Sequence, residues 1–251
     1  MKAVTVTPED LRAIERLHVR AWPALETADI DGWLWRRSGG GSNRANSVST
    51  VRFTGTDAEA ALDAIEARYR ARNAPARVCV YYLSEPPGLT ERLKARGYDN
   101  NETTLTMTKP LVRRPPRGDV AVSERPNADW LDIYLGAITE DRRIINVEIL
   151  KSIPPPCAFF ACMRDARAVS TGLGVADGRF AAIECMATRA DARRQGGAQA
   201  VLAAIEHWAE REGAHTLALQ AVAINAAAIA LYRGFGFEQV ATNRFWVKDR
   251  T

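Results

Sequence analysis

The chain has 251 residues, 47% hydrophobic and 25% charged, which is the composition of an ordinary globular protein with room for two domains. Its net charge is only +4 and its basic residues are spread along the sequence, so no Lys/Arg block predicts nucleic-acid binding. No apolar run approaches the length of a membrane span and the start of the chain lacks the core of a signal peptide, so we expect a cytoplasmic protein without a membrane partner. Three scattered histidines, and four cysteines without CxxC spacing, argue against a metal site or disulfides.

The first half, residues 1–110, has the pattern of a complete α/β unit. Thr7-Pro8-Glu9-Asp10 has the residues of a helix start, with Thr7 as N-cap, and this helix is expected to run to about Trp22. Apolar patterning and turn residues predict the elements that follow. These are strands at 32–38, 77–83 and 103–108 and helices at 57–72 and 89–95.

The second half repeats this order. The run 78–80 aligns with 217–219 and the run 93–98 with 232–237, both at an offset of 139 residues, while 61–66 aligns with 201–206 at an offset of 140. Such a repeat indicates a tandem duplication. A basic segment with adjacent prolines, residues 111–118, is predicted to be the linker between domains at 1–110 and 119–251.

The second half is expected to open with a strand at 120–122 and two helices, the second of which stops at three consecutive prolines. A helix from residue 200 follows the central strand and its polar turn. The predicted elements are helices at 126–138, 140–152 and 226–232 and strands at 157–163, 168–176, 180–188, 215–222 and 244–248.

A basic, glycine-bearing turn follows the strand 180–188. Its sequence is Arg193-Arg194-Gln195-Gly196-Gly197-Ala198. Unpaired backbone N–H groups and the positive end of a helix dipole attract an anion, glycine permits close approach, and arginine adds charge. This pattern predicts a phosphate-binding site. The sequence of the turn contains neither GxGxxG nor GK[ST], which excludes the dinucleotide fingerprint and the P-loop.

Two spaced motifs carry a family resemblance. Arg193, Gly196 and Ala198 in the pattern Arg-x-x-Gly-x-Ala resemble motif A of the GNAT (N-acetyltransferase) superfamily, the loop that holds the pyrophosphate of acetyl-CoA. Asn225 and Tyr232 in the pattern Asn-x-x-Ala-x-x-x-Tyr, followed by a Gly-Phe turn, resemble motif B. The resemblance covers about residues 119–251. With the internal repeat, it implies two GNAT-like domains in tandem, each a mixed, mostly antiparallel α/β sheet flanked by helices.

The motifs depart from the family pattern in two places. Gly197 and Ala198 stand where an aliphatic residue and a glycine are usual, and we expect Gly197 to weaken the start of the helix slightly. In the first half the basic loop is replaced by residues 54–59, whose Asp57 and Glu59 would repel a pyrophosphate. We therefore predict that the first copy has lost cofactor binding. It then either stabilises the second copy or forms one wall of the substrate cleft.

The resemblance implies an acetyl-CoA-dependent transferase that moves an acetyl group to an amine of a small molecule, peptide or protein by direct attack in a ternary complex. Acetyl-CoA is then a co-substrate, no metal takes part, and a homodimer is left open. The turn would hold the pyrophosphate, the main chain of Met186 and Thr188 would pair with the pantetheine, and Asn225 would contact the pantetheine or cap a helix. The predicted cofactor-binding residues are Met186, Ala187, Thr188, Arg193, Arg194, Gln195, Gly196, Gly197, Ala198 and Asn225.

Two side chains are predicted to be catalytic, each with an alternative. Tyr232 matches the family's tyrosine that protonates the thiolate of CoA, and a phenol of pKa about 10 suits that task; the alternative is a packing tyrosine. Glu184 lies within an apolar strand, where an unpaired carboxylate is costly. It is either a general base facing the cleft or a paired, structural carboxylate.

Several alternatives remain at the level of function. A non-catalytic acyl-CoA sensor or scaffold, or a transferase of longer acyl groups, would share these motifs. In GNAT folds the helices predicted at 126–152 flank the acceptor site, which singles out six side chains there. The segment 44–48 resembles one in bacterial tandem GNAT proteins, but its sequence indicates no role. The six candidate acceptor contacts are Trp130, Tyr134, Asp141, Arg142, Arg143 and Asn146.

Overall fold

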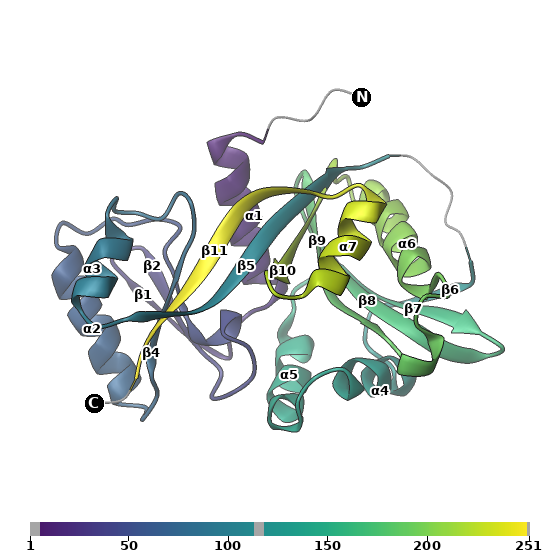
Figure 1. Cartoon of the computed structure of the whole chain (residues 1–251), viewed down its shortest axis with the longest axis horizontal. Helices are drawn as coiled ribbons and strands as arrows, with labels where there is room; N and C mark the ends of the chain where they lie inside the picture. Colours follow the sequence, from purple (N-terminus) through teal and green to yellow (C-terminus); the bar gives the residue numbers. More distant parts are fainter. Residues whose placement is uncertain (1–5, 113–117, 250–251) are drawn as a thin grey trace.

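The computed structural model describes residues 6–112 and 118–249 of the chain (Figure 1). One sheet of eleven strands runs through the molecule, in the order β1-β2-β3-β4-β11-β5-β10-β9-β8-β7-β6. Neighbouring strands are antiparallel except for β3 with β4 and β9 with β10. Helices flank both faces. The predicted fold class, a mixed and mostly antiparallel α/β sheet built twice in tandem, is therefore confirmed.

The helices and strands follow the predicted order, and two helices, α3 and α5, have the predicted bounds. The first half contains α1 (Pro8–Ala21), β1 (Glu26–Ile30), β2 (Trp33–Arg37), β3 (Val48–Ser49), α2 (Ala58–Arg70), β4 (Ala76–Val80), α3 (Leu89–Ala95) and β5 (Asp99–Pro110). The second half contains β6 (Val120–Ser123), α4 (Ala128–Gly136), α5 (Glu140–Ser152), β7 (Cys157–Arg164), β8 (Arg167–Asp177), β9 (Phe180–Thr188), α6 (Gly197–Arg211), β10 (Thr216–Val222), α7 (Ala226–Phe235) and β11 (Glu238–Lys248). Short 3-10 turns lie at Arg44–Asn46 and Ala190–Ala192.

The strand β1 was not predicted, and the last strand of each half, β5 and β11, is longer than predicted. In β1 exposed and half-buried residues alternate, because it is an edge strand that pairs only with β2, so it lacks an apolar run. The strands β5 and β11 extend well beyond their apolar segments because they pair with each other along almost their full length.

The two halves exchange their last strands. β5, at the end of the first half, pairs with β10 of the second half, while β11, at the end of the second, pairs with β4 of the first. In Figure 1 these two strands cross side by side from one half to the other, and the end of β11 lies beside α2. The sheet thus continues across the predicted domain boundary, and the division at 110–119 stays a prediction. Residues 113–117 of the predicted linker lie outside the described part of the chain.

The helix α1 belongs to the first half in sequence but packs on the second. It begins with the predicted cap, because the Thr7 hydroxyl accepts a hydrogen bond from Asp10 N and the Asp10 carboxylate accepts one from Thr7 N. Its buried Ile14 and Leu17 share one core with α4, α5, β8 and β9. The helices α6 and α7 form a separate core on the opposite face of the sheet. Within the described residues, no helix is long and apolar enough to cross a membrane.

Candidate active site

The parallel strands β9 and β10 separate from each other halfway along their length. Residues 180–183 pair with 216–219, but β9 continues to Thr188 and β10 to Val222 without further pairing between them. The register of β9 against β8 also shifts next to Cys185, which has a φ of 54°. From Glu184 and Gln220 onward, backbone edges thus face a wedge-shaped opening, where an extended ligand can add as a strand.

The helix α6 begins beside this opening with an uncapped N-terminus. Its N-cap is Gly196, at a φ of 84°, and no side chain accepts a hydrogen bond from the first-turn N–H groups. Arg193 and Arg194 are exposed on the preceding loop, and neither makes an ion pair within the described part of the chain. The Gln195 side chain bonds to Arg164, and its Nε2 donates to Asp191 O at 3.1 Å. Free N–H groups and two unpaired guanidinium groups make this end of α6 a place for a polyanion.

The role of Gly197 differs from the sequence expectation. A Cβ at this position would lie 2.4 Å from Ser170 Oγ, which is itself within 2.9 Å of Thr188 Oγ1. Gly197 is therefore required for the close approach of α6 to β8, whereas the sequence indicated only a slightly weakened helix start. A cavity of about 530 Å³ opens along the same end of α6, lined by Gly196, Ala200 and Phe235 of α7 among others.

The corresponding places in the first half are filled by the protein itself. At the start of α2, the Asp57 carboxylate accepts hydrogen bonds from Glu59 N at 2.9 Å and Ala60 N at 3.1 Å. The parallel strands of this half are β3 and β4. Beyond them, the Glu85 amide donates a hydrogen bond to Thr50 O at 3.2 Å, so the segments that follow the two strands are joined. An anion would find the α2 N-terminus already capped by a carboxylate.

Glu184 is buried in β9 and paired with an arginine from the first half. The Arg44 guanidinium donates two hydrogen bonds, from Nη1 to Oε1 and from Nη2 to Oε2, both 2.6 Å long. The two residues are 140 positions apart in the sequence. His18 Nδ1 of α1 lies 3.3 Å from Oε1. Burial by itself would raise the pKa of Glu184, but the charge and hydrogen bonds of Arg44, with His18, lower it to about 2. In this geometry Glu184 is an ionised, satisfied carboxylate.

A second buried carboxylate, Glu15 of α1, lies near this pair. It accepts hydrogen bonds from Asn243 Nδ2 at 2.8 Å, Thr106 Oγ1 at 3.2 Å and Gln220 Nε2 at 3.3 Å. Burial raises the pKa of Glu15, while His18 and these hydrogen bonds oppose the rise. The polar network therefore joins α1 to β5, β10 and β11 directly below the opening.

Tyr232 approaches the opening from the α7 face. Its ring is buried and packs edge-on against Phe237, with centroids 6.0 Å apart. Burial, and the neighbouring Glu184 and Cys185, raise the pKa of the phenol, so it stays protonated throughout the neutral range. Asn225 caps α7, because its Oδ1 accepts from Ala228 N at 3.1 Å.

A cavity of about 260 Å³ reaches the opening from the face that α1 and α5 cover. The first half contributes the loop 41–44 together with Glu102 and Thr104 of β5; the second contributes Arg142 of α5 and Gln220 and Val222 of β10. The first half thus completes the sheet and forms one wall of this cavity; that the cavity is the substrate cleft stays a prediction.

Of the six candidate acceptor contacts, only Arg142 lines this cavity. Trp130 is buried and donates its Nε1 hydrogen to Gly172 O, and buried Asn146 donates to the Tyr134 hydroxyl. Asp141 and Arg143 are exposed. Sequence reasoning missed Arg44 and His18 as site residues. Arg44 lies in the segment 44–48 that resembles one in bacterial tandem GNAT proteins, but its pairing with Glu184 joins residues 140 positions apart, which no local pattern indicates.

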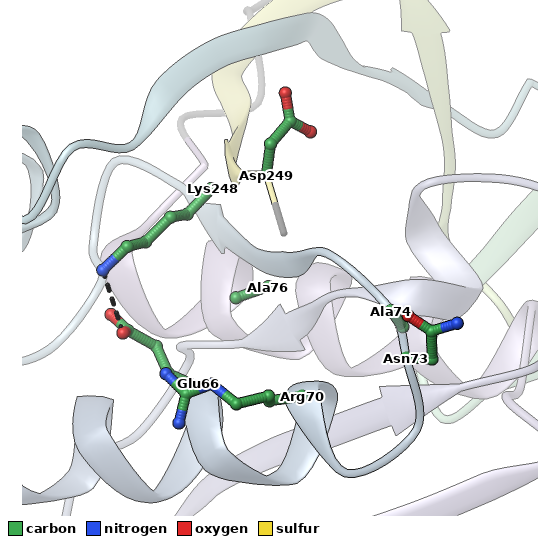
Figure 2. A pocket seen from close by; sticks show the side chains of 7 residues that line it. All are labelled: Glu66, Arg70, Asn73, Ala74, Ala76, Lys248 and Asp249. Atoms are coloured by element: carbon green, nitrogen blue, oxygen red, sulfur yellow. Dashed lines mark hydrogen bonds and ion pairs between the residues drawn. The ribbon is translucent and has the colours of Figure 1, made fainter. Parts of the chain in front are cut away.

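A much smaller cavity of about 90 Å³ lies in the first half, near the end of β11 (Figure 2). Glu66 of α2 and Lys248 of β11 form a 3.0 Å ion pair beside it. Because these charges satisfy each other and the volume is far below that of a usual ligand site, we assign it no binding role.

A sheet that opens between two parallel strands, beside an uncapped, arginine-flanked helix N-terminus, defines the class of this protein as a GNAT-type acyltransferase. The chain belongs to the family described as "Probable histone acetyltransferase Rv0428c C-terminal", whose model matches residues 8–246.

The similar proteins agree with this class. The chain is 28% identical over 252 residues to the "Uncharacterized N-acetyltransferase YobR" of Bacillus subtilis (strain 168), covering 96% of this chain and 99% of that protein. A solved GCN5-related N-acetyltransferase from Kribbella flavida has a TM-score of 0.70 at 17% identity, covering 96% of each chain. A tandem GNAT protein from the clavulanic acid biosynthesis pathway has a TM-score of 0.62 at 12% identity, covering 99% of this chain and 90% of the other. At these identities the two solved structures show a common fold.

Proposed function

We propose that the chain transfers an acetyl group from acetyl-CoA to an amine by direct attack in a ternary complex, at one site in its second half. The observation that carries the proposal is the contrast between the two helix N-termini. The N–H groups that begin α6 are uncapped beside Arg193 and Arg194, whereas Asp57 occupies the equivalent position on α2. One half is thus suited to a pyrophosphate and the other is not.

The residues around the opening fit acetyl-CoA. Backbone N–H groups of 195–198, with the two arginines, would bind the pyrophosphate. The free edge of β9 at 186–188, including Ala187, would pair with the pantetheine as an added strand. Because Asn225 already caps α7, we expect it to support the site by fixing the start of that helix.

In the transfer step the neutral acceptor nitrogen bonds to the acetyl carbon while the bond to the CoA sulfur breaks, and the proton that the nitrogen loses passes to water. Tyr232, which stays protonated, would donate its proton to the departing thiolate. Burial and the nearby Glu184 raise the pKa of the Cys185 thiol, so Cys185 is a poor nucleophile. This disfavours an acyl-enzyme intermediate on Cys185 and supports direct attack by the acceptor. Because Arg44 holds the pKa of Glu184 at about 2, we favour the paired, structural role for Glu184 over that of a general base.

An acyltransferase needs one approach for the acyl-CoA and a separate one for the acceptor. Tyr232 and the helix α6 lie on one face of the sheet, and the cavity between the halves reaches the opening from the other. A module that only binds acyl-CoA has no need of the second approach, so the arrangement supports turnover over a sensor role. The length of the acyl group is proposed to be that of acetyl.

Calorimetric titration of acetyl-CoA tests the proposal. Wild type should bind one equivalent per chain, and Arg193→Ala/Arg194→Ala should weaken binding by at least about a hundredfold, because each of the two charge-assisted contacts contributes roughly 1.5–3 kcal/mol. Arg211→Ala, at the other end of α6, is the matched control and should bind normally. Thiol release with a panel of amines then measures turnover. No binding would overturn the assignment, and two equivalents per chain would contradict the loss of the first site.

A further inference from the structure

The cavity between the halves carries opposite charges that do not pair with each other. Glu102 of β5 and Arg142 of α5 both line it. Within the described residues, neither side chain forms an ion pair. Arg142 Nε and Thr104 Oγ1, which lines the same cavity, are also buried without a hydrogen-bond partner there. A guanidinium and a carboxylate that share a cavity without pairing can each bind an opposite charge on a ligand.

The position of Glu102 along β5 separates it from the reacting centre. Gln220, where β10 leaves β9, pairs with Thr106, and Val222 pairs with Thr104. Glu102 lies two residues beyond Thr104 and four beyond Thr106, so it is about 14 Å along the strand from the level of Gln220, at a rise of roughly 3.4 Å per residue. The amine that attacks the thioester must lie at the opening. Glu102 is therefore placed to bind a cationic group of the acceptor other than the attacking amine.

From this arrangement we infer that the acceptor is a free diamino acid. The inference rests on the proposed acetyl transfer and names its substrate class. The ammonium of the amino-acid end lies at Glu102, the carboxylate lies at Arg142, and the second amine, on an extended aliphatic chain, reaches the opening near Gln220. A cavity of about 260 Å³ suits a ligand of this size and is small for a folded protein surface.

The charges argue against a basic protein tail as the acceptor. Arg142 and Glu102 are the unpaired charges of the described lining, because the third charged residue there, Arg44, is paired with Glu184. A lysine within a polypeptide carries no free carboxylate for Arg142, and neighbouring basic residues would meet like charge. The cavity therefore selects a small zwitterion over a peptide.

Steady-state thiol release with matched amines tests the inference. L-lysine is compared with cadaverine, which lacks the carboxylate, with 6-aminohexanoate, which lacks the second ammonium, and with a basic peptide containing internal lysines. We expect kcat/KM for L-lysine or L-ornithine to exceed that for each truncated amine and for the peptide by about tenfold to a hundredfold, as for loss of one charge-assisted hydrogen bond.

Charge-removing variants locate the two contacts. Arg142→Gln should abolish the preference for L-lysine over cadaverine, and Glu102→Gln should abolish the preference over 6-aminohexanoate. Arg143→Gln, the next residue on α5, and Asp99→Asn, on the exposed end of β5, are matched controls that should keep both preferences. Because each test is a ratio between substrates of one variant, partial unfolding does not imitate the result.

The failure of this inference is distinct from failure of the proposed function. If acetyl-CoA binds and cadaverine or the peptide is acetylated as fast as L-lysine, the acceptor assignment is overturned while acetyl transfer stands. The assignment is also overturned if both preferences survive in Arg142→Gln and Glu102→Gln. If acetyl-CoA does not bind, both proposals fall.

Discussion

Replacing Arg44 by glutamine tests how the two halves are joined. The variant removes both hydrogen bonds to Glu184 and leaves a carboxylate that is 5% exposed without its countercharge. The pKa of Glu184 lies at about 2 instead of 4.5, and at 1.36 kcal/mol per pKa unit this difference corresponds to about 3 kcal/mol. We therefore expect Arg44→Gln to lower the free energy of unfolding by about 3 kcal/mol at pH 7, in the range for breaking a buried ion pair.

The pH dependence gives the sign of the effect. A carboxyl group whose folded pKa is depressed stabilises the fold fully above its unfolded pKa of about 4.5, and this contribution is lost as the pH falls through about 2. In Arg44→Gln only His18 still opposes the effect of burial, so the pKa of Glu184 should rise. The deficit relative to wild type should therefore be largest at pH 8 and narrow towards pH 5, as the buried group takes up a proton.

Urea unfolding of wild type and variant between pH 5 and 8 measures this deficit. Arg12→Gln is the matched control, because the Arg12–Glu85 pair is 3.2 Å long but about one-third exposed, and such pairs contribute less than about 1 kcal/mol. The double variant Arg44→Gln/Glu184→Gln should lose less stability than the sum of the single variants. A loss below 1 kcal/mol at pH 7, or a deficit that is constant with pH, would refute this reasoning.

Three further predictions concern the two copies of the site. Tyr232→Phe should lower kcat about a hundredfold with the Kd of acetyl-CoA unchanged, since it removes only the proton donor; wild-type kcat would assign a packing role. Gly197→Ala should cost about 1–3 kcal/mol in urea unfolding through the clash with Ser170 Oγ, and Ser170→Ala should recover part of this loss; unchanged stability would disprove the close approach. Asp57→Ala should cost about 1 kcal/mol as a lost N-cap, and calorimetry should still find one acetyl-CoA per chain, because this change supplies no cation in the first half.

The sequence alone determined the features that depend on neighbouring residues. The cap at Thr7, the bounds of α5 before three prolines, and the glycine-bearing turn before α6 follow from local backbone chemistry. The motif spacing and the internal repeat also revealed the class of protein and its duplication. Periodicity showed that Glu184 lies in an apolar strand, which required it to be paired or functional.

The tertiary structure alone decided which distant segments meet. The pattern of a strand specifies which side chains share a face but not which strand lies beside it, so the exchange of β5 and β11 could not be predicted. The pairing of Arg44 with Glu184 and the presence of Glu102 and Arg142 in one cavity depend on how the two halves meet. Both arrangements bring together side chains from the two halves. Their interaction energies depend on burial and distance, which are fixed only when the two halves fold into one sheet.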